Sequence, residues 1–365
     1  MTGCPTAYFN PPRRLPFIPP EAPQGKRLIS LAINESPFGC SPRAAEAAAE
    51  RLKQPNRYPD PSSRKLRQAI GAVHGYDPER IVCGNGSEEL LDVIGRMFAR
   101  PGDEIAMAQS GFFQFAVVAA RVGADLKRLP EREGFVLDTE AALAHITERT
   151  KIVFLAIPNN PTGTVLSADA VERFQARLPG HVVLVLDLAY GEFLPPDELA
   201  RLMAMAERLD TVIALRTFSK AYGLAALRVG WMLAPEWMLG GLNMLRGVGN
   251  VNAIAQAAAE AAVQDRAFVA EAVRQTGEER AFLAGILDRV GLAYVPGLGN
   301  FLLTRFPDAE GRRVEDFLAR VMADHGIWLR PVGEPGFQGW CRIGIGTRAE
   351  NHLLAEALDR FKRSD

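Results

Sequence analysis

Cysteine, long apolar runs and net charge are all scarce in this sequence, and each scarcity excludes a class of protein. Only four cysteines occur in 365 residues, with no CxxC pair and no zinc spacing, so we expect reduced thiols, no metal and a cytoplasmic protein. No run of about 18 apolar residues occurs, so no membrane helix is expected. A formal net charge of −1 gives no electrostatic basis for binding nucleic acid or an anionic membrane.

The remaining composition, 48% hydrophobic and 23% charged, is that of an ordinary globular protein. The length predicts one large domain and a smaller one. Residues 1–30 are rich in proline, so they are expected to form an extended arm. They lack the apolar core of a signal peptide, so no signal peptide is expected. We predict a large α/β domain over residues 31–250 and a small α+β domain over residues 251–365.

Within the large domain, short apolar runs alternate with loops and helical segments. Residues 81–83, 104–107, 152–157 and 182–187 are such runs, and a polar cluster follows each. Strands that are apolar throughout and alternate with helices indicate a mostly parallel central sheet with helices on both faces. Ligands bind such sheets at the carboxyl ends of the strands, where these polar clusters fall.

One of these clusters surrounds Lys220, directly after the apolar run at residues 212–216. A desolvated lysine near other cations has a lowered pKa and can form a Schiff base with a carbonyl group. Ser219 and Arg228 offer a hydroxyl and a guanidinium to a phosphate. An aldehyde together with a phosphate indicates pyridoxal phosphate. A solvated turn is the alternative that this stretch alone leaves open.

The other clusters fit such a ligand, although each has a plainer explanation. Residues 84–89 (Gly-Asn-Gly-Ser-Glu-Glu) resemble a dinucleotide fingerprint without its third glycine, but this turn can still direct helix N–H groups at an anion. Asp187 can face a pyridinium nitrogen or only cap a turn. Tyr190 and Asn160 can hydrogen-bond a ring oxygen, and Asn160 also lies in a plain turn sequence. Phe112 or Phe113 can stack on a ring or belong to the core.

In the small domain, two arginines are candidates for binding anions. Arg342 can clamp a substrate carboxylate, although a salt bridge is the simpler explanation. Arg330 is the second candidate.

Taken together, residues from about Leu31 to Arg360 resemble the fold-type I pyridoxal-phosphate-dependent aminotransferases (class I/II), in particular the histidinol-phosphate aminotransferase branch. The motifs that carry the resemblance are Asn34-Glu-Ser-Pro37, Arg57-Tyr-Pro59, Gly84-Asn-Gly-Ser-Glu-Glu89, Asn159-Asn-Pro-Thr-Gly163, Asp187-Leu-Ala-Tyr190, Ser219-Lys220 with Arg228, Gly299-Asn-Phe301 and Arg342-Ile-Gly-Ile-Gly-Thr-Arg348.

The resemblance implies a role for each matching residue. Lys220 would form the Schiff base with pyridoxal 5'-phosphate, Asp187 would pair with the ring nitrogen, and Phe112 would stack on the ring. Tyr190 and Asn160 would bind the ring oxygen. The phosphate would be held by the backbone of Ser87 and Glu88, by Ser219 and Arg228, and by Tyr58 from the other subunit of a homodimer. The substrate would contact Arg342, Arg330, Asn34 and Phe17.

Departures from the family pattern put the substrate in doubt. Phe17 stands where this branch usually has a tyrosine, and no Pro-Phe precedes Asn250. We therefore expect an aminotransferase acting on histidinol phosphate, in histidine biosynthesis, or on an aromatic amino acid, with a 2-oxo acid such as 2-oxoglutarate as acceptor. The alternatives are a lyase or decarboxylase on the same scaffold and a non-catalytic pyridoxal-phosphate-binding regulator.

Overall fold

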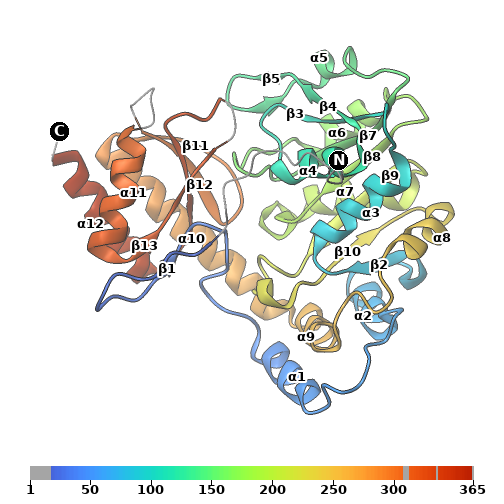
Figure 1. Cartoon of the computed structure of the whole chain (residues 1–365), viewed down its shortest axis with the longest axis horizontal. Coiled ribbons are helices and arrows are strands. Elements are labelled where there is room, and N and C mark those ends of the chain that lie inside the picture. The colour runs from blue at the N-terminus through green and yellow to red at the C-terminus, as the bar shows by residue number, and fades with distance from the viewer. Residues whose placement is uncertain (1–17, 307–311, 334–335, 364–365) are drawn as a thin grey trace, which may run out of the picture.

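The computed structural model describes residues 18–306, 312–333 and 336–363, which form a larger and a smaller part (Figure 1). The long helix α10 (Arg266–Val290) leads from the larger part into the smaller one. The prediction for Phe17 lies outside the described residues.

The larger part is built on a seven-stranded sheet. β10 runs antiparallel to both neighbours and the other pairs are parallel, which confirms the predicted mostly parallel sheet. In spatial order the strands are β2 (Ile81–Gly84), β10 (Gly230–Leu233), β9 (Val212–Thr217), β8 (Val183–Asp187), β7 (Thr150–Ala156), β3 (Glu104–Ala108) and β4 (Asp125–Leu129).

The strands are apolar at successive positions because both faces of the sheet are covered. Along β8, Val183 and Val185 belong to one apolar cluster, whereas Leu184 and Leu186 belong to another on the opposite face. The first cluster is covered by α3 (Ser87–Phe98), α4 (Phe113–Val122) and α8 (Glu236–Leu245). The second is covered by α2 (Arg64–His74), α6 (Ala168–Gln175), α7 (Pro196–Arg208) and α9 (Ala253–Gln264).

Shorter elements complete the larger part. α1 (Pro42–Leu52) packs on α9, and its N-cap is Ser41, whose hydroxyl accepts a hydrogen bond from the Arg43 N–H. The remaining elements are α5 (Thr139–Leu143), the hairpin of β5 (Glu131–Arg132) and β6 (Val136–Leu137), and the 3-10 turns η1 (Pro78–Arg80), η2 (Gly191–Phe193) and η3 (Ala225–Leu227).

The smaller part contains a four-stranded antiparallel sheet and the helices α10, α11 (Arg312–His325) and α12 (Arg348–Arg363). Its strands are β11 (Ala293–Val295), β12 (Phe301–Arg305), β15 (Trp340–Gly344) and β14 (Arg330–Pro331).

The end of the predicted arm packs with this smaller part. β1 (Ile29–Ser30) pairs with β13 (Ile327–Trp328), and Ile29 and Leu31 are buried in the apolar cluster formed by α10, α11 and α12. The domain boundaries at residues 30 and 250 stay predictions.

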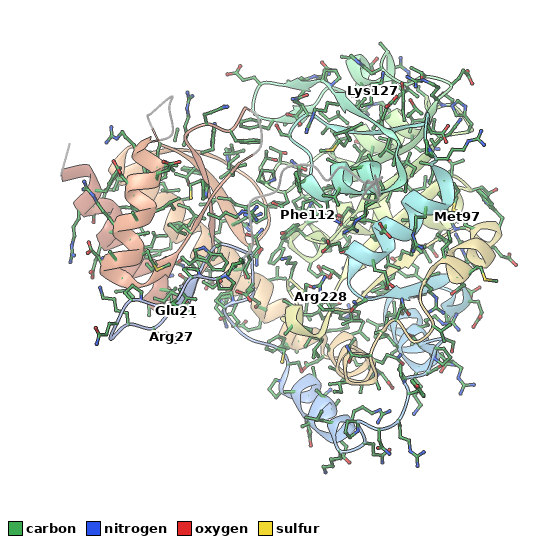
Figure 2. All side chains as sticks on the ribbon, viewed as in Figure 1. Glu21, Arg27, Met97, Phe112, Lys127 and Arg228 are labelled. Carbon is green, nitrogen blue, oxygen red and sulfur yellow. The ribbon has the colours of Figure 1, made fainter. Side chains whose placement is uncertain are left out.

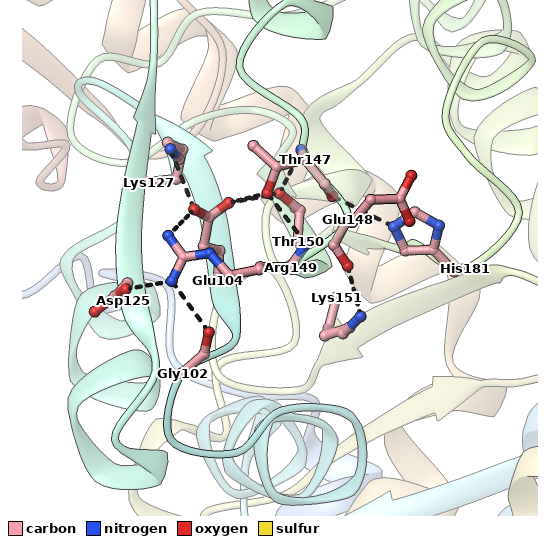
Figure 3. A network of polar contacts seen from close by, with 10 residues as sticks. All are labelled: Gly102, Glu104, Asp125, Lys127, Thr147, Glu148, Arg149, Thr150, Lys151 and His181. Carbon is pink, nitrogen blue, oxygen red and sulfur yellow. Dashed lines mark hydrogen bonds and ion pairs between the residues drawn. The ribbon is translucent and has the colours of Figure 1, made fainter.

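At the amino ends of the strands, a polar network surrounds the buried Glu104 (Figure 3). Its carboxylate accepts hydrogen bonds from Thr147, Thr150 and Arg149 at 2.8–2.9 Å. Burial raises the pKa of Glu104, but hydrogen bonds from Thr147, Thr150 and Lys127 bring it below the ordinary value overall. This network ties β3, β4 and β7 together at the edge opposite to the strand ends where polar clusters were predicted.

Among the residues that the structure describes, no helix is both long enough and apolar enough to cross a membrane.

Candidate active site

A cavity of about 570 Å³ lies at the carboxyl ends of the large sheet and extends to β14 and β15 of the smaller part. Figure 2 shows Phe112 and Arg228, which both line it, near the middle of the molecule. The predicted site residues that line this one cavity are Asn34, Ser87, Glu88, Phe112, Asn160, Asp187, Tyr190, Ser219, Lys220, Arg228, Arg330 and Arg342.

Lys220 follows the end of β9 and points toward the segment that enters the larger part. Its Nζ donates to the backbone oxygen of Asn34 at 3.1 Å and lies 5.6 Å from the centre of the Tyr190 ring. Burial lowers the pKa of Lys220 to about 7, assisted by the positive charges of Arg342 and Arg228. A large fraction of this amine is therefore neutral at physiological pH, which a nucleophile or a proton carrier requires.

Asp187 ends β8 and is only 3% exposed. Its carboxylate accepts from the Ala189 N–H at 3.1 Å, and no ion-pair partner lies within reach among the described residues. Burial raises the pKa of Asp187 to about 6, an effect that the Ala189 N–H and Lys220 partly offset. A buried carboxylate is costly unless a cation meets it. The protonated ring nitrogen of pyridoxal phosphate is such a cation, so this residue fits the predicted cofactor.

Tyr190 and Asn160 are both oriented as hydrogen-bond donors toward the cavity. The Tyr190 hydroxyl accepts from Asn34 Nδ2 at 2.8 Å, which leaves its own proton to donate. Asn160 Oδ1 accepts from Arg342 Nη1 at 2.6 Å, which leaves the Asn160 Nδ2 group as the donor. Two hydrogen-bond donors lining the same cavity suit an anionic ring oxygen.

A second group of donors forms a cup for an anion at the start of α3. Gly86 caps this helix with a φ of +79°, and a Cβ there would lie 2.4 Å from Arg228 Nη2. Arg228 Nη1 also lies 3.3 Å from the Ser219 hydroxyl. The helix N-terminus at Ser87, the hydroxyl and the guanidinium therefore converge, as phosphate binding requires.

Phe112 lies at the N-cap of α4, half-buried on the wall of the cavity. It packs edge to face on Phe115, with ring centres 5.6 Å apart and an interplanar angle of 84°. Phe115 in turn stacks on Phe154 in the core. One face of a flat ligand could thus rest on a phenyl ring held by the sheet.

The structure does not bring Tyr58 into this cavity. Its side chain is 97% exposed and lines a separate surface hollow together with Arg57 and Gly249. Conversely, Glu35 and Gln114 line the cavity although they were not predicted as site residues. Glu35 lies within the motif Asn34-Glu-Ser-Pro37, so the sequence could have indicated it as a site residue. No feature of the sequence distinguishes Gln114.

Comparisons with known proteins agree with this geometry. A family model described as aminotransferase class I and II matches residues 26–358. A histidinol-phosphate aminotransferase from Maricaulis maris is 40% identical over 344 residues, which cover 94% of each chain. One from Rhodopseudomonas palustris strain BisB18 is 38% identical over 352 residues, or 95% of each chain.

A solved structure leads to the same family. The histidinol-phosphate aminotransferase from Sinorhizobium meliloti, in complex with pyridoxal-5'-phosphate, is 32% identical with a TM-score of 0.86, covering 92% of this chain and 90% of that one. These matches do not favour the lyase or decarboxylase alternative. With a family model spanning most of the chain and relatives this similar over nearly their whole length, the protein belongs to the class I and II aminotransferases, and its cofactor is pyridoxal 5'-phosphate.

Proposed function

We propose that this aminotransferase takes its amino group from histidinol phosphate and passes it to a 2-oxo acid such as 2-oxoglutarate, as a step of histidine biosynthesis. The observation that carries the proposal is the pairing of Arg330 with Arg342 on adjacent antiparallel strands, both lining the cavity of Lys220. Guanidinium groups bind phosphates and carboxylates in a bidentate manner. One pair of arginines can therefore receive the phosphate of the donor or a carboxylate of the acceptor.

The residues of this chain divide the chemistry between them. When bound, pyridoxal phosphate supplies an aldehyde that accepts the amino group and a ring that takes up electrons. Lys220 Nζ, whose pKa burial lowers to about 7, would act as the base that takes the proton from the substrate Cα and as the acid that releases it again. Asp187 would pair with the protonated ring nitrogen, and Tyr190 and Asn160 would donate to the ring oxygen. Phe112 would stack on the ring, and the phosphate would be held by the Ser87–Glu88 backbone, Ser219 and Arg228.

A homodimer is part of the proposal, with Tyr58 completing the phosphate site of the partner. Tyr58 and Val248 are exposed by 97% and 96%, and Met244 by 85%. Tyr58 and Val248 are on loops and Met244 is at the end of α8, and exposed apolar side chains of this size favour an interface with a second copy. A cytoplasmic location remains a prediction from the reduced cysteines.

Aminotransfer from several donors to 2-oxoglutarate tests the substrate. We expect turnover with histidinol phosphate and a lower but measurable turnover with phenylalanine or tyrosine, because Phe17 offers no hydroxyl to a phosphate. Phe17→Tyr should raise the ratio of kcat/KM for histidinol phosphate over phenylalanine by about ten- to a hundred-fold, the effect of one hydrogen bond to a charged group. Arg330→Gln should lower the same ratio.

Two results would contradict the proposal. Absence of turnover with histidinol phosphate would exclude it as the amino donor. Borohydride reduction followed by peptide mapping should place the cofactor on Lys220, and a label on a different lysine would exclude the proposed site.

A further inference from the structure

A buried ion pair next to the site has no place in the chemistry described so far. Arg216 Nη2 lies 2.5 Å from Glu192 Oε1, and the two side chains are only 4% and 7% exposed. We propose that this ion pair is a positioning device that holds the turn bearing Tyr190 and Asp187 in register with the strand bearing Lys220. The inference rests on the roles proposed above for these three residues.

The pair joins the two segments that carry the chemistry. Arg216 is on β9, directly before Thr217, where the strand ends and the segment leading to Lys220 begins. Glu192 is on η2, directly after the turn that runs from Asp187 to Tyr190. The ion pair is therefore a side-chain link between the position of the lysine and the position of the tyrosine.

The turn between Asp187 and Glu192 is tight, so a displacement at one end reaches the other. The Gly191 N–H donates to the Leu188 oxygen at 2.9 Å, and the Ala189 N–H donates to Asp187 Oδ1 at 3.1 Å. Asp187 is held by β8 at the near end of this turn, and Glu192 is held by Arg216 at the far end. Tyr190 lies between these two fixed points.

Arg216 is itself confined from two sides. Its guanidinium carbon lies 5.8 Å from the centre of the Trp231 ring on β10. On the other side, its Nε lies 3.3 Å from the position that a Cβ would take on Gly191. The guanidinium thus fills the space between β10 and the turn, and its position determines where the turn can lie.

The energetics of the pair argue against a role in stability alone. Arg216 Nε and Glu192 Oε2 are buried, and neither has a hydrogen-bond partner among the residues that the structure describes. Buried ion pairs with unsatisfied atoms gain little over neutral side chains of similar volume, although losing only one partner is strongly destabilising. Stability and positioning can therefore be separated by replacing both residues at once.

The test compares Glu192→Gln, Arg216→Met and the double variant, all purified with bound cofactor. Each single variant should unfold at a lower temperature, and the double variant should recover most of this loss. Its kcat should nevertheless stay about 10- to 100-fold below wild type, since a misplacement of about 1 Å at reacting groups has such an effect, with KM changed less than kcat. The pH at which the visible absorption band of the bound cofactor changes should also shift, because Tyr190 donates to the ring oxygen.

A readout without cofactor uses the rate at which an amine-directed reagent modifies Lys220 as a function of pH. The pH dependence of this modification rate should shift in the double variant, because the groups that surround the Lys220 amine would be displaced. The matched control is Glu140→Gln/Arg177→Met, which removes an exposed pair with the same 2.5 Å separation. The control should leave kcat, the absorption band and the Lys220 profile unchanged.

The conservative variant Glu192→Asp keeps both charges and shortens the side chain by one methylene, so it provides the test if the double variant fails to fold. We expect Glu192→Asp to lower kcat and to shift the pH dependence of the absorption band of the bound cofactor. Wild-type kcat and spectra in Glu192→Asp, or full recovery of kcat in the double variant, would overturn the inference. A borohydride label away from Lys220 would instead overturn the proposed function on which it rests.

Discussion

At the scale of single residues, burial moves the two central ionisable groups toward their neutral forms. The pKa of Lys220 is lowered to about 7 and that of Asp187 is raised to about 6, in both cases chiefly by desolvation. The lysine becomes usable as a base near neutral pH. The carboxylate, by contrast, is stabilised only when a cation lies beside it. The site is therefore costly to fold without its cofactor.

Asp187→Asn should separate function from stability. Without cofactor, the raised pKa of Asp187 contributes stability that is present below about pH 3.8 and lost as the pH rises through about 6. Above pH 6 the buried carboxylate thus costs on the order of 3 kcal/mol, which a neutral asparagine avoids. We expect the melting temperature of the cofactor-free variant to rise relative to wild type between pH 4.5 and pH 8. The variant with cofactor should lose about a hundred-fold or more in kcat.

Thermal melts across this pH range and steady-state rates are the measurements. A melting-temperature difference that does not change with pH would mean that Asp187 is not buried as a costly anion. Near-normal turnover would make it a turn residue only.

At the scale of elements, the cup for the phosphate depends on one glycine between β2 and α3. Gly86 has a φ of +79°, and its missing Cβ leaves the space that Arg228 occupies. Glu89 on the first turn of α3 accepts a hydrogen bond from the Asn85 N–H at 2.6 Å, which secures the same turn. The turn is thus shaped for a side chain to approach the helix N-terminus closely.

Gly86→Ala should weaken cofactor binding more than it weakens the fold. At a φ of +79° and a ψ of 165°, a region occupied almost only by glycine, a residue with a Cβ costs on the order of 1–3 kcal/mol, and the guanidinium of Arg228 would also have to move away. We expect the affinity for pyridoxal phosphate, measured by absorbance titration, to fall about ten-fold or more. Gly75→Ala is the control for a positive φ without a neighbouring guanidinium, because Gly75 has a φ of +82° and a ψ of 17° and no atom of the described residues lies within 4 Å of its Cβ position. Equal losses of cofactor affinity in both variants would contradict this account of the cup.

At the scale of the whole molecule, the cavity joins parts of the chain that are far apart in sequence. Arg342 on β15 donates to Asn160 at 2.6 Å and to the Ala32 oxygen at 2.6 Å. Asn300 Nδ2 donates to the Asn34 oxygen at 3.0 Å, next to Lys220. The site therefore exists only when the larger and smaller parts are assembled.

The proposed homodimer predicts that two inactive variants complement each other. Lys220→Ala and a severely impaired Tyr58→Ala are expected to be inactive alone, but a hybrid dimer contains one site with both residues intact. Random exchange of equal amounts gives hybrids in about half of the dimers, so activity should return to about a quarter of wild type. Activity after verified subunit exchange is the measurement. A monomer in sedimentation, or exchange without recovery, would contradict the role of Tyr58.

Local chemistry was sufficient to predict much of this protein. The apolar runs at residues 182–187 and 212–216 form β8 (Val183–Asp187) and β9 (Val212–Thr217) of a mostly parallel sheet. These features depend on residues close together in sequence, because a short run that is apolar at every position indicates a strand buried on both faces of a sheet. Because all parallel strands bring their carboxyl ends to one edge, the polar clusters after them could also be predicted to meet.

Tertiary structure alone decided the rest. β10 runs antiparallel between β2 and β9, and Arg216 meets Glu192 across 24 residues of chain. β1 (Ile29–Ser30) pairs with the distant β13, and Asn34 has a φ of +57°. Short-range sequence patterns do not specify such pairings, because the pairings depend on contacts between segments that are far apart in the chain. The sequence by itself determined the helices and strands, the class of cofactor and the edge of the sheet where the cofactor binds. Tertiary packing determined which side chains contact one another at that edge.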